Sequence, residues 1–141
     1  MQADERRAKE AVFSPVFRRG GLAVLAVAYA VTLVLATHYP KPEQLLGRYG
    51  HADKLLHFVA YFLLAVFVAA AVWGAGRWSR RAALIVAIAL AAFGAVDEIT
   101  QPLFGRTADV LDWAADCAGI AVGLLLVVIT SSAWGRGSHR G

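Results

Sequence analysis

The chain has 141 residues, of which 59% are hydrophobic and 17% are charged. This composition, with a mean hydropathy of +0.58, excludes an ordinary soluble domain, because a soluble domain of this size exposes a larger share of polar residues. The net charge of +4 does not indicate nucleic-acid binding, because the basic residues form short clusters between apolar blocks. The single cysteine excludes a disulfide framework within the chain.

Four apolar stretches are long enough to cross a membrane as helices. A bilayer core about 30 Å thick needs about 20 residues at a rise of about 1.5 Å per residue. The stretches cover residues 20–38, 54–74, 81–101 and 109–130. We therefore predict an all-α fold, a polytopic membrane protein with a four-transmembrane-helix bundle. Residues 20–130 form this domain, between an N-terminal tail of residues 1–19 and a C-terminal tail of residues 131–141.

The positions of the basic residues predict the direction in which the helices cross. Loops rich in Lys and Arg stay on the cytoplasmic side of a membrane. The two tails and the second loop carry ten of these residues, whereas the first and third loops with the adjoining helix ends carry four. We predict that both tails are cytoplasmic and that the protein lies in the cytoplasmic membrane of a bacterium.

Acidic and other polar residues collect where the last three spans reach the predicted outer face. On the second and fourth spans they are three or four positions apart, so each set occupies one helix face. These sets are Asp53, His57 and Tyr61 on the second span, and Asp109, Asp112 and Asp116 on the fourth. We expect the other histidines, His38, His51 and His139, to be solvated or to lie at an interface.

The third span carries the most informative polar residues. Its uncharged run, residues 82–96, is too short to cross the bilayer core alone. The turn with Asp97, Glu98 and Gln101 must therefore help to complete the crossing. A carboxylate near a helix C-terminus opposes the helix dipole, so helix capping does not explain these acids. By contrast, Asp53 and Asp109 at the starts of the second and fourth spans fit the role of N-caps.

The acids in this region outnumber the permanent cations. Six carboxylates are accompanied by Lys54 and Arg106, which leaves about four negative charges that a low-dielectric site cannot hold uncompensated. We therefore expect protons, a divalent cation or a cationic ligand to share the site. The carboxylates considered as metal ligands are Asp97, Glu98, Asp109 and Asp112.

Small residues and a turn predict how the helices pack around these acids. Three small residues lie four positions apart on the fourth span, at Ala115, Gly119 and Gly123. This spacing permits close approach of a neighbouring helix, with Asp116 facing the bundle interior. A tight turn at Gly105 would bring Arg106 back over the carboxylates. There it would either clamp a phosphate or pair with an aspartate.

The order of the polar residues supplies a family resemblance. The pattern runs over residues 53–123 through Asp53, Lys54, His57, Tyr61, Asp97, Glu98, Gln101, Arg106, Asp109, Asp112, Asp116, Gly119 and Gly123. It resembles the VanZ-like integral membrane proteins, a family named for a component associated with teicoplanin resistance. The resemblance implies a cell-envelope role, which extends to glycopeptide-antibiotic resistance. The chain departs from the family pattern at Asp116, where the resemblance implies an asparagine.

Three functions stay open at this point. In the first, the protein binds or modifies a lipid-linked or other amphiphilic envelope molecule among the membrane lipids. Arg106 and Lys54 would hold an anionic head group, while other residues exchange protons or orient the ligand. The candidate catalytic residues are His57, Asp97, Glu98 and Asp112. The candidate ligand-binding residues are Asp53, Lys54, Tyr61, Gln101, Arg106, Asp109 and Asp116.

The second function is a non-catalytic membrane scaffold, in which the polar residues only fix helix packing. The third is a proton-coupled or cation-coupled transporter, which is disfavoured because the inner halves of the spans are almost wholly apolar. The sequence contains no nucleophile elbow, phosphate-binding glycine loop or HExxH motif. It therefore leaves open whether the protein is an enzyme, and it does not indicate the oligomeric state.

Overall fold

The computed structural model of the protein describes residues 15–39 and 50–137. Within these residues the chain forms four long helices and one short 3-10 helix, and no β-strand. The elements are α2 (Pro15–Thr37), α4 (Gly50–Gly74), α5 (Arg80–Thr100), η1 (Gln101–Phe104) and α6 (Val110–Gly137). The predicted all-α fold is confirmed.

Each long helix contains a segment with the length and hydropathy of a membrane span. These segments are Gly20–Thr37, Asp53–Gly74, Arg80–Phe104 and Val110–Ser132. They agree with the four predicted spans to within a few residues. At two places the helices extend into the predicted tails, because α2 already begins at Pro15 and α6 continues to Gly137. Residues 1–14 and 138–141 of those tails lie outside the described residues.

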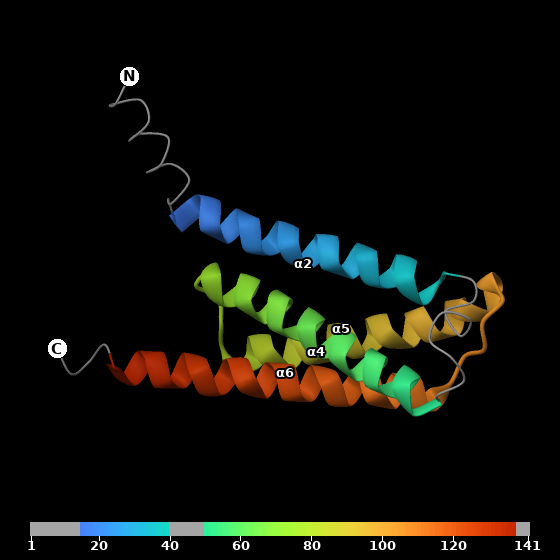
Figure 1. The fold of residues 1–141 in the computed structure, drawn as a ribbon. Coiled ribbons are helices and arrows are strands. Elements are labelled where there is room, and N and C mark those ends of the chain that lie inside the picture. Colours follow the sequence, from blue (N-terminus) through green and yellow to red (C-terminus); the bar gives the residue numbers. More distant parts are fainter. Residues whose placement is uncertain (1–14, 40–49, 138–141) are drawn as a thin grey trace, which may run out of the picture.

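The four long helices lie side by side and alternate in direction along the bundle (Figure 1). The start of α2, the connection between α4 and α5, and the end of α6 lie at one end of the bundle. The end of α2, the start of α4, η1 and the start of α6 meet at the other, which we call the polar end. α4 occupies the centre, because it contacts α2, α5 and α6.

The core is built from apolar side chains of all four long helices. Its largest members face the centre from α4, with Tyr61 and Leu64 almost fully buried, and α6 adds Ile120 and Leu124. Many large apolar side chains point away from the core, among them Leu84, Ile88, Leu103 and Leu125. An apolar exterior on long apolar helices is what a lipid environment requires.

Two glycines of α6 allow its backbone to pack closely against the backbone of α4. A Cβ added at Gly119 would collide with the backbone oxygen of Phe58, and one at Gly123 would lie 2.7 Å from that of Phe62. The predicted close approach at these two glycines is confirmed. It brings the first turns of α4 and α6 together, and with them the polar residues that they carry.

Candidate functional site

The polar end gathers polar side chains that are shielded from solvent. They come from all four long helices and from η1, and they are Thr37, His57, Asp97, Glu98, Gln101, Asp112 and Asp116. Asp116 and Gln101 are completely buried, as is Tyr61 beside them. The inward direction predicted for Asp116 is therefore confirmed.

Asp97 connects three helices through its carboxylate. Thr37 of α2 donates a hydrogen bond to its Oδ1 at 2.8 Å, and Tyr61 of α4 donates to its Oδ2 at 3.5 Å. The Nδ1 of His38 lies 3.4 Å from the same Oδ1, and the Nε2 of His38 lies 2.9 Å from the hydroxyl of Thr100. Asp97 thus links the end of α2 to α5.

Glu98 holds the connection between α5 and α6. Its Oε1 accepts a hydrogen bond of 2.8 Å from the side-chain amide of Gln101, and its Oε2 accepts one of 3.1 Å from the backbone N–H of Asp109. The same Oε1 lies 3.7 Å from Nδ1 of His57. The Oε1 of Gln101 has no hydrogen-bond partner among the described residues.

His57 and Asp116 form a buried pair between α4 and α6. Nδ1 of His57 lies 3.0 Å from Oδ1 of Asp116, and the two side chains are 5% and 0% exposed. A neutral imidazole that donates from Nδ1 keeps the lone pair on Nε2, so the pair fixes which nitrogen is free. The Oδ2 of Asp116 has no hydrogen-bond partner in the described part of the chain.

Lys54 bridges two acids of α6. Its Nζ lies 2.8 Å from Oδ2 of Asp109 and 2.8 Å from Oδ1 of Asp112. The hydrogen bond from Lys54 holds the pKa of Asp109 below its ordinary value. Oδ1 of Asp109 accepts a hydrogen bond of 2.8 Å from the backbone of Leu111, so this residue does cap α6. The charge of Lys54 is already balanced within the protein.

Arg106 returns over the acids as predicted. Gly105 before it adopts a left-handed conformation with φ 77°, which a glycine accepts without strain. Nη1 of Arg106 donates to the backbone oxygen of Thr37 at 2.8 Å, and Nη2 lies 3.9 Å from Oδ1 of Asp53. The guanidinium therefore bridges α2 and α4, and it approaches an aspartate without a short hydrogen bond to it.

A cavity of about 270 Å³ opens beside Arg106 and His57. One part of its wall is apolar and the other part is polar. It is lined by Leu33, Ala36, Thr37, Asp53, Leu56, His57, Ala60 and Arg106. Among the residues that the structure describes, the lining comes from α2, α4 and the loop before α6, so the cavity lies on the α2 side of the polar end.

Residues 11–131 match the family model described as VanZ/LLP1. The chain belongs to the VanZ/LLP1 family. The match covers most of the chain and includes all four candidate spans, so the resemblance to VanZ-like proteins is confirmed. Comparison with curated proteins and with solved structures gives no significant match.

In this VanZ/LLP1 protein the predicted site residues fall into connected groups. Asp97 accepts hydrogen bonds from Thr37 of α2 and from Tyr61, while Glu98, which also binds Gln101, accepts from the backbone before α6. The remaining predicted residues surround the cavity or the bridge made by the lysine, and these are Asp53, Lys54, His57, Arg106, Asp109, Asp112 and Asp116. All eleven predicted residues thus lie at the polar end.

The site also contains residues of α2 and α5 that the sequence patterns did not single out. His38 is not solvated, because its side chain is 12% exposed and contacts Asp97 and Thr100. Thr37 donates to Asp97 and accepts, through its backbone oxygen, from Arg106. A Thr-His pair at the end of the first span was the available signal. The side chains of His51 and His139 lie outside the described residues.

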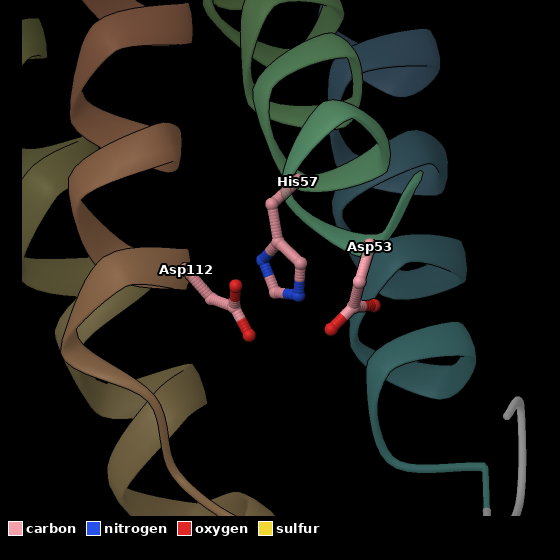
Figure 2. A group of neighbouring side chains, drawn as sticks. All are labelled: Asp53, His57 and Asp112. Carbon is pink, nitrogen blue, oxygen red and sulfur yellow. The ribbon is translucent and has the colours of Figure 1, made fainter. Parts of the chain in front are cut away.

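Two groups of side chains in this VanZ/LLP1 protein are arranged so that they could hold a metal ion. One consists of Asp53, His57 and Asp112, and the other of His57, Glu98 and Asp116, with the ligand atoms of each group within 4.8 Å of one another. Figure 2 shows the imidazole of the first group between its two carboxylates. Of the four predicted metal ligands, Glu98 and Asp112 fall in different groups, and Asp97 and Asp109 fall in neither.

Proposed function

We propose that the protein binds the anionic head group of an amphiphilic envelope molecule, such as a lipid-linked precursor, in the cavity at the polar end. The observation that carries this proposal is the composition of the cavity wall. Apolar side chains of α2 and α4 face a polar corner formed by Arg106, His57 and Asp53. A ligand that is apolar at one end and charged at the other is complementary to such a wall.

Arg106 is the residue best suited to hold the head group. Its side chain is 9% exposed, and one of its nitrogens is fixed by the backbone oxygen of Thr37. The guanidinium offers five N–H donors, and its planar shape matches two oxygens of a phosphate or carboxylate. Lys54 contributes less than we expected from the sequence, because Asp109 and Asp112 already bind its ammonium group.

His57 gives the cavity a group that can transfer a proton. The hydrogen bond between its Nδ1 and Asp116 orients the ring, and the ring borders the cavity. A histidine fixed by a buried carboxylate is a suitable general base, because the carboxylate stabilises the protonated ring. Modification of the bound molecule by acid/base chemistry at a phosphate or acyl bond is therefore part of the proposal.

A second cavity, of about 480 Å³, is consistent with the proposal that the ligand is amphiphilic. It lies between α2 and α5 and is lined mainly by apolar residues such as Leu35, Phe93 and Val96. Its described lining contains Asp97 and His38 but no Lys or Arg, so it suits a hydrocarbon chain better than an anionic head group.

The proposal is tested by the lipids that accompany the purified protein. We expect mass spectrometry of gently solubilised wild-type protein to detect an anionic amphiphile, and Arg106→Gln to lose most of it. Arg77→Gln is the matched control, because Arg77 is exposed and lies between α4 and α5 at the opposite end of the bundle. Equal amounts of the same lipid in wild-type and Arg106→Gln protein would rule out the head-group site.

A scaffold function is the second candidate, because the same polar contacts tie the helices together. Thr37 with Asp97 joins α2 to α5, and Lys54 joins α4 to α6. If packing were their only role, Glu98→Gln would lower the folded yield and any phenotype in parallel. Transport is disfavoured, because the buried polar residues of the described chain all lie at the polar end.

The cell-envelope role implied by the family resemblance leads to a phenotype test. We propose that the site acts in the outer leaflet of a bacterial cytoplasmic membrane, where lipid-linked envelope precursors and glycopeptides meet. Expression of wild-type protein in a teicoplanin-sensitive host should raise the inhibitory concentration of the antibiotic, and Arg106→Gln should not.

A further inference from the structure

We infer a divalent-cation site at the edge of the head-group cavity, formed by Nε2 of His57 and the carboxylates of Asp53 and Asp112. The inference deepens the head-group part of the proposed function and rests on it in one respect, namely that the cation would also contact the bound head group. It is an alternative to the role of His57 as a general base, because Nε2 cannot hold a cation and accept a proton at the same time. It names a set of ligands that differs from the four carboxylates expected from the sequence.

The three side chains converge from two helices. Asp53 and His57 lie one turn apart on α4, and Asp112 reaches them from the first turn of α6. Their ligand atoms lie within 4.8 Å of one another. Figure 2 shows the imidazole between the two carboxylates.

The free nitrogen of His57 is an independent observation that points to a ligand. The side chain is 5% exposed, its Nδ1 is occupied by Asp116, and its Nε2 has no hydrogen-bond partner among the described residues. Nε2 is not among the fully buried atoms that lack a partner in the described chain, which are Oε1 of Gln101 and Oδ2 of Asp116, and the ring borders the cavity. In metal sites the nitrogen that does not bind the metal commonly donates to a carboxylate, as Nδ1 does here.

The carboxylates retain oxygens for a cation. Lys54 contacts Oδ1 of Asp112, and no hydrogen bond occupies its Oδ2 within the described residues. Asp53 is 44% exposed and approaches Arg106 only at 3.9 Å. Its exposure gives an ion a path to the site from the polar end. The excess of acids over Lys and Arg adds a favourable field for a divalent charge.

The alternative group, with Glu98 and Asp116, is less suited to an ion. Both of these carboxylates face Nδ1 of His57, and all three side chains are buried. An ion there would have to displace the hydrogen bond that fixes the ring. It would also lack an exposed ligand on its entry path.

The ligand types narrow the choice of metal. One imidazole nitrogen with two carboxylates favours Zn²⁺ or Mn²⁺ over Mg²⁺ or Ca²⁺, which prefer oxygen ligands alone. Three protein ligands leave at least one coordination position open. Because Asp53 and His57 both line the cavity, a phosphate or carboxylate oxygen of the head group would complete the coordination there.

The test measures metal binding directly. Purified protein in detergent is stripped with a chelator and titrated with Mn²⁺, and free Mn²⁺ is followed by electron paramagnetic resonance. We expect wild-type protein to bind about one ion per chain, and Asp53→Asn and His57→Gln to bind it more than about tenfold more weakly. His38→Gln is the matched control, because His38 also lies at the polar end but in neither group.

Two outcomes overturn the inference. One is the absence of saturable binding to wild-type protein, and the other is unchanged binding by Asp53→Asn. Asp53 is half-exposed, so this variant is expected to fold even if His57→Gln does not. Lipid content is measured in the same samples. Lipid without metal would overturn the cation site alone, whereas metal without lipid would overturn the proposed function and leave the cation site intact.

Discussion

At the scale of single residues, each buried carboxylate of the polar end is bound by a donor from another helix or from the backbone. Asp97 accepts from Thr37, Glu98 accepts from Gln101, and Asp112 contacts Lys54. A buried acceptor that loses its donor costs about 1–3 kcal/mol, and more when it is charged. The residues that donate these hydrogen bonds therefore stabilise the fold, because they satisfy the buried carboxylates.

Thr37→Val tests this with little change in shape. The substitution removes the hydrogen bond of 2.8 Å to Asp97, so we expect the free energy of unfolding to fall by about 1–3 kcal/mol. Thr32→Val is the control, because the hydroxyl of Thr32 is exposed and donates to the backbone oxygen of Ala28 within its own helix. Thermal unfolding in detergent compares the two. Equal melting temperatures for both variants would contradict a stabilising role of the bond.

The lowered pKa of Asp109 leads to a prediction of how the stability of the fold depends on pH. Lys54 lowers the pKa of folded Asp109 below its ordinary value of 3.8, so folding favours the ionised form. The resulting stability is complete above that ordinary value and is lost as the pH falls through the lowered pKa. We expect wild-type protein to melt above Asp109→Asn at neutral pH, and the difference to shrink on acidification. A difference that grows with falling pH would contradict this sign.

Residue types and spacing were sufficient to predict which acids gather, but not what they bind. The faces of the second and fourth spans follow from helical spacing, so Asp112 and Asp116 were predictable. Lys54 was expected to hold a head group, yet it bridges Asp109 and Asp112. Whether a side chain binds a ligand or another residue of the protein depends on the distance between two helices. That distance cannot be predicted from the spacing of residues within one helix.

At the scale of helices, the contact between α4 and α6 positions the site. It places Nδ1 of His57 at 3.0 Å from Oδ1 of Asp116, and Nζ of Lys54 at 2.8 Å from Oδ1 of Asp112. Such short distances between side chains require closely packed backbones, and glycines allow this in membranes. The geometry of the candidate cation site therefore depends on two residues, Gly119 and Gly123, that contribute no functional group to it.

Gly119→Ala should separate these helices. Its Cβ would collide with the backbone oxygen of Phe58, which cannot move away as a side chain would. We expect a loss near the upper end of the range of about 1–3 kcal/mol for overpacked sites, together with weaker Mn²⁺ binding. Gly21→Ala is the control, because nothing lies within 4 Å of the added Cβ. If unfolding in detergent shows the two variants to be equally stable, the close contact is not required.

The sequence predicted the helices well and their ends less well. Apolar length determines a span, so all four spans were predictable. The start of α2 at Pro15 and the end of α6 at Gly137 were not, because a helix can continue past its apolar segment where polar residues also favour helical structure. The contribution of α2 to the site was missed for a similar reason. Thr37 and His38 end an apolar span, where interfacial polar residues are common.

At the scale of the whole molecule, the polar end is one of the two ends of the bundle, each of which lies near one surface of the membrane. The buried polar side chains of the described residues lie there, whereas Arg77 in the connection between α4 and α5, and Arg80 and Arg81 at the start of α5, are exposed at the opposite end. The molecule is therefore asymmetric across the membrane. The orientation of the bundle therefore decides on which face of the membrane the proposed head-group site lies.

Reporter fusions determine this orientation. The ten Lys and Arg residues of the tails and second loop, against four elsewhere, predict that alkaline phosphatase is inactive when fused after residue 76 or 141 and active after residue 105. A fluorescent reporter that matures only in the cytoplasm should give the reverse pattern. Because residue 105 precedes Arg106, its side of the membrane is also that of the cavity. The opposite result is an active phosphatase after residue 76 and an inactive one after residue 105. It would place the proposed head-group site in the cytoplasmic leaflet, where lipid-linked precursors are made. Glycopeptides do not act in that leaflet, so the proposed link to resistance would be contradicted.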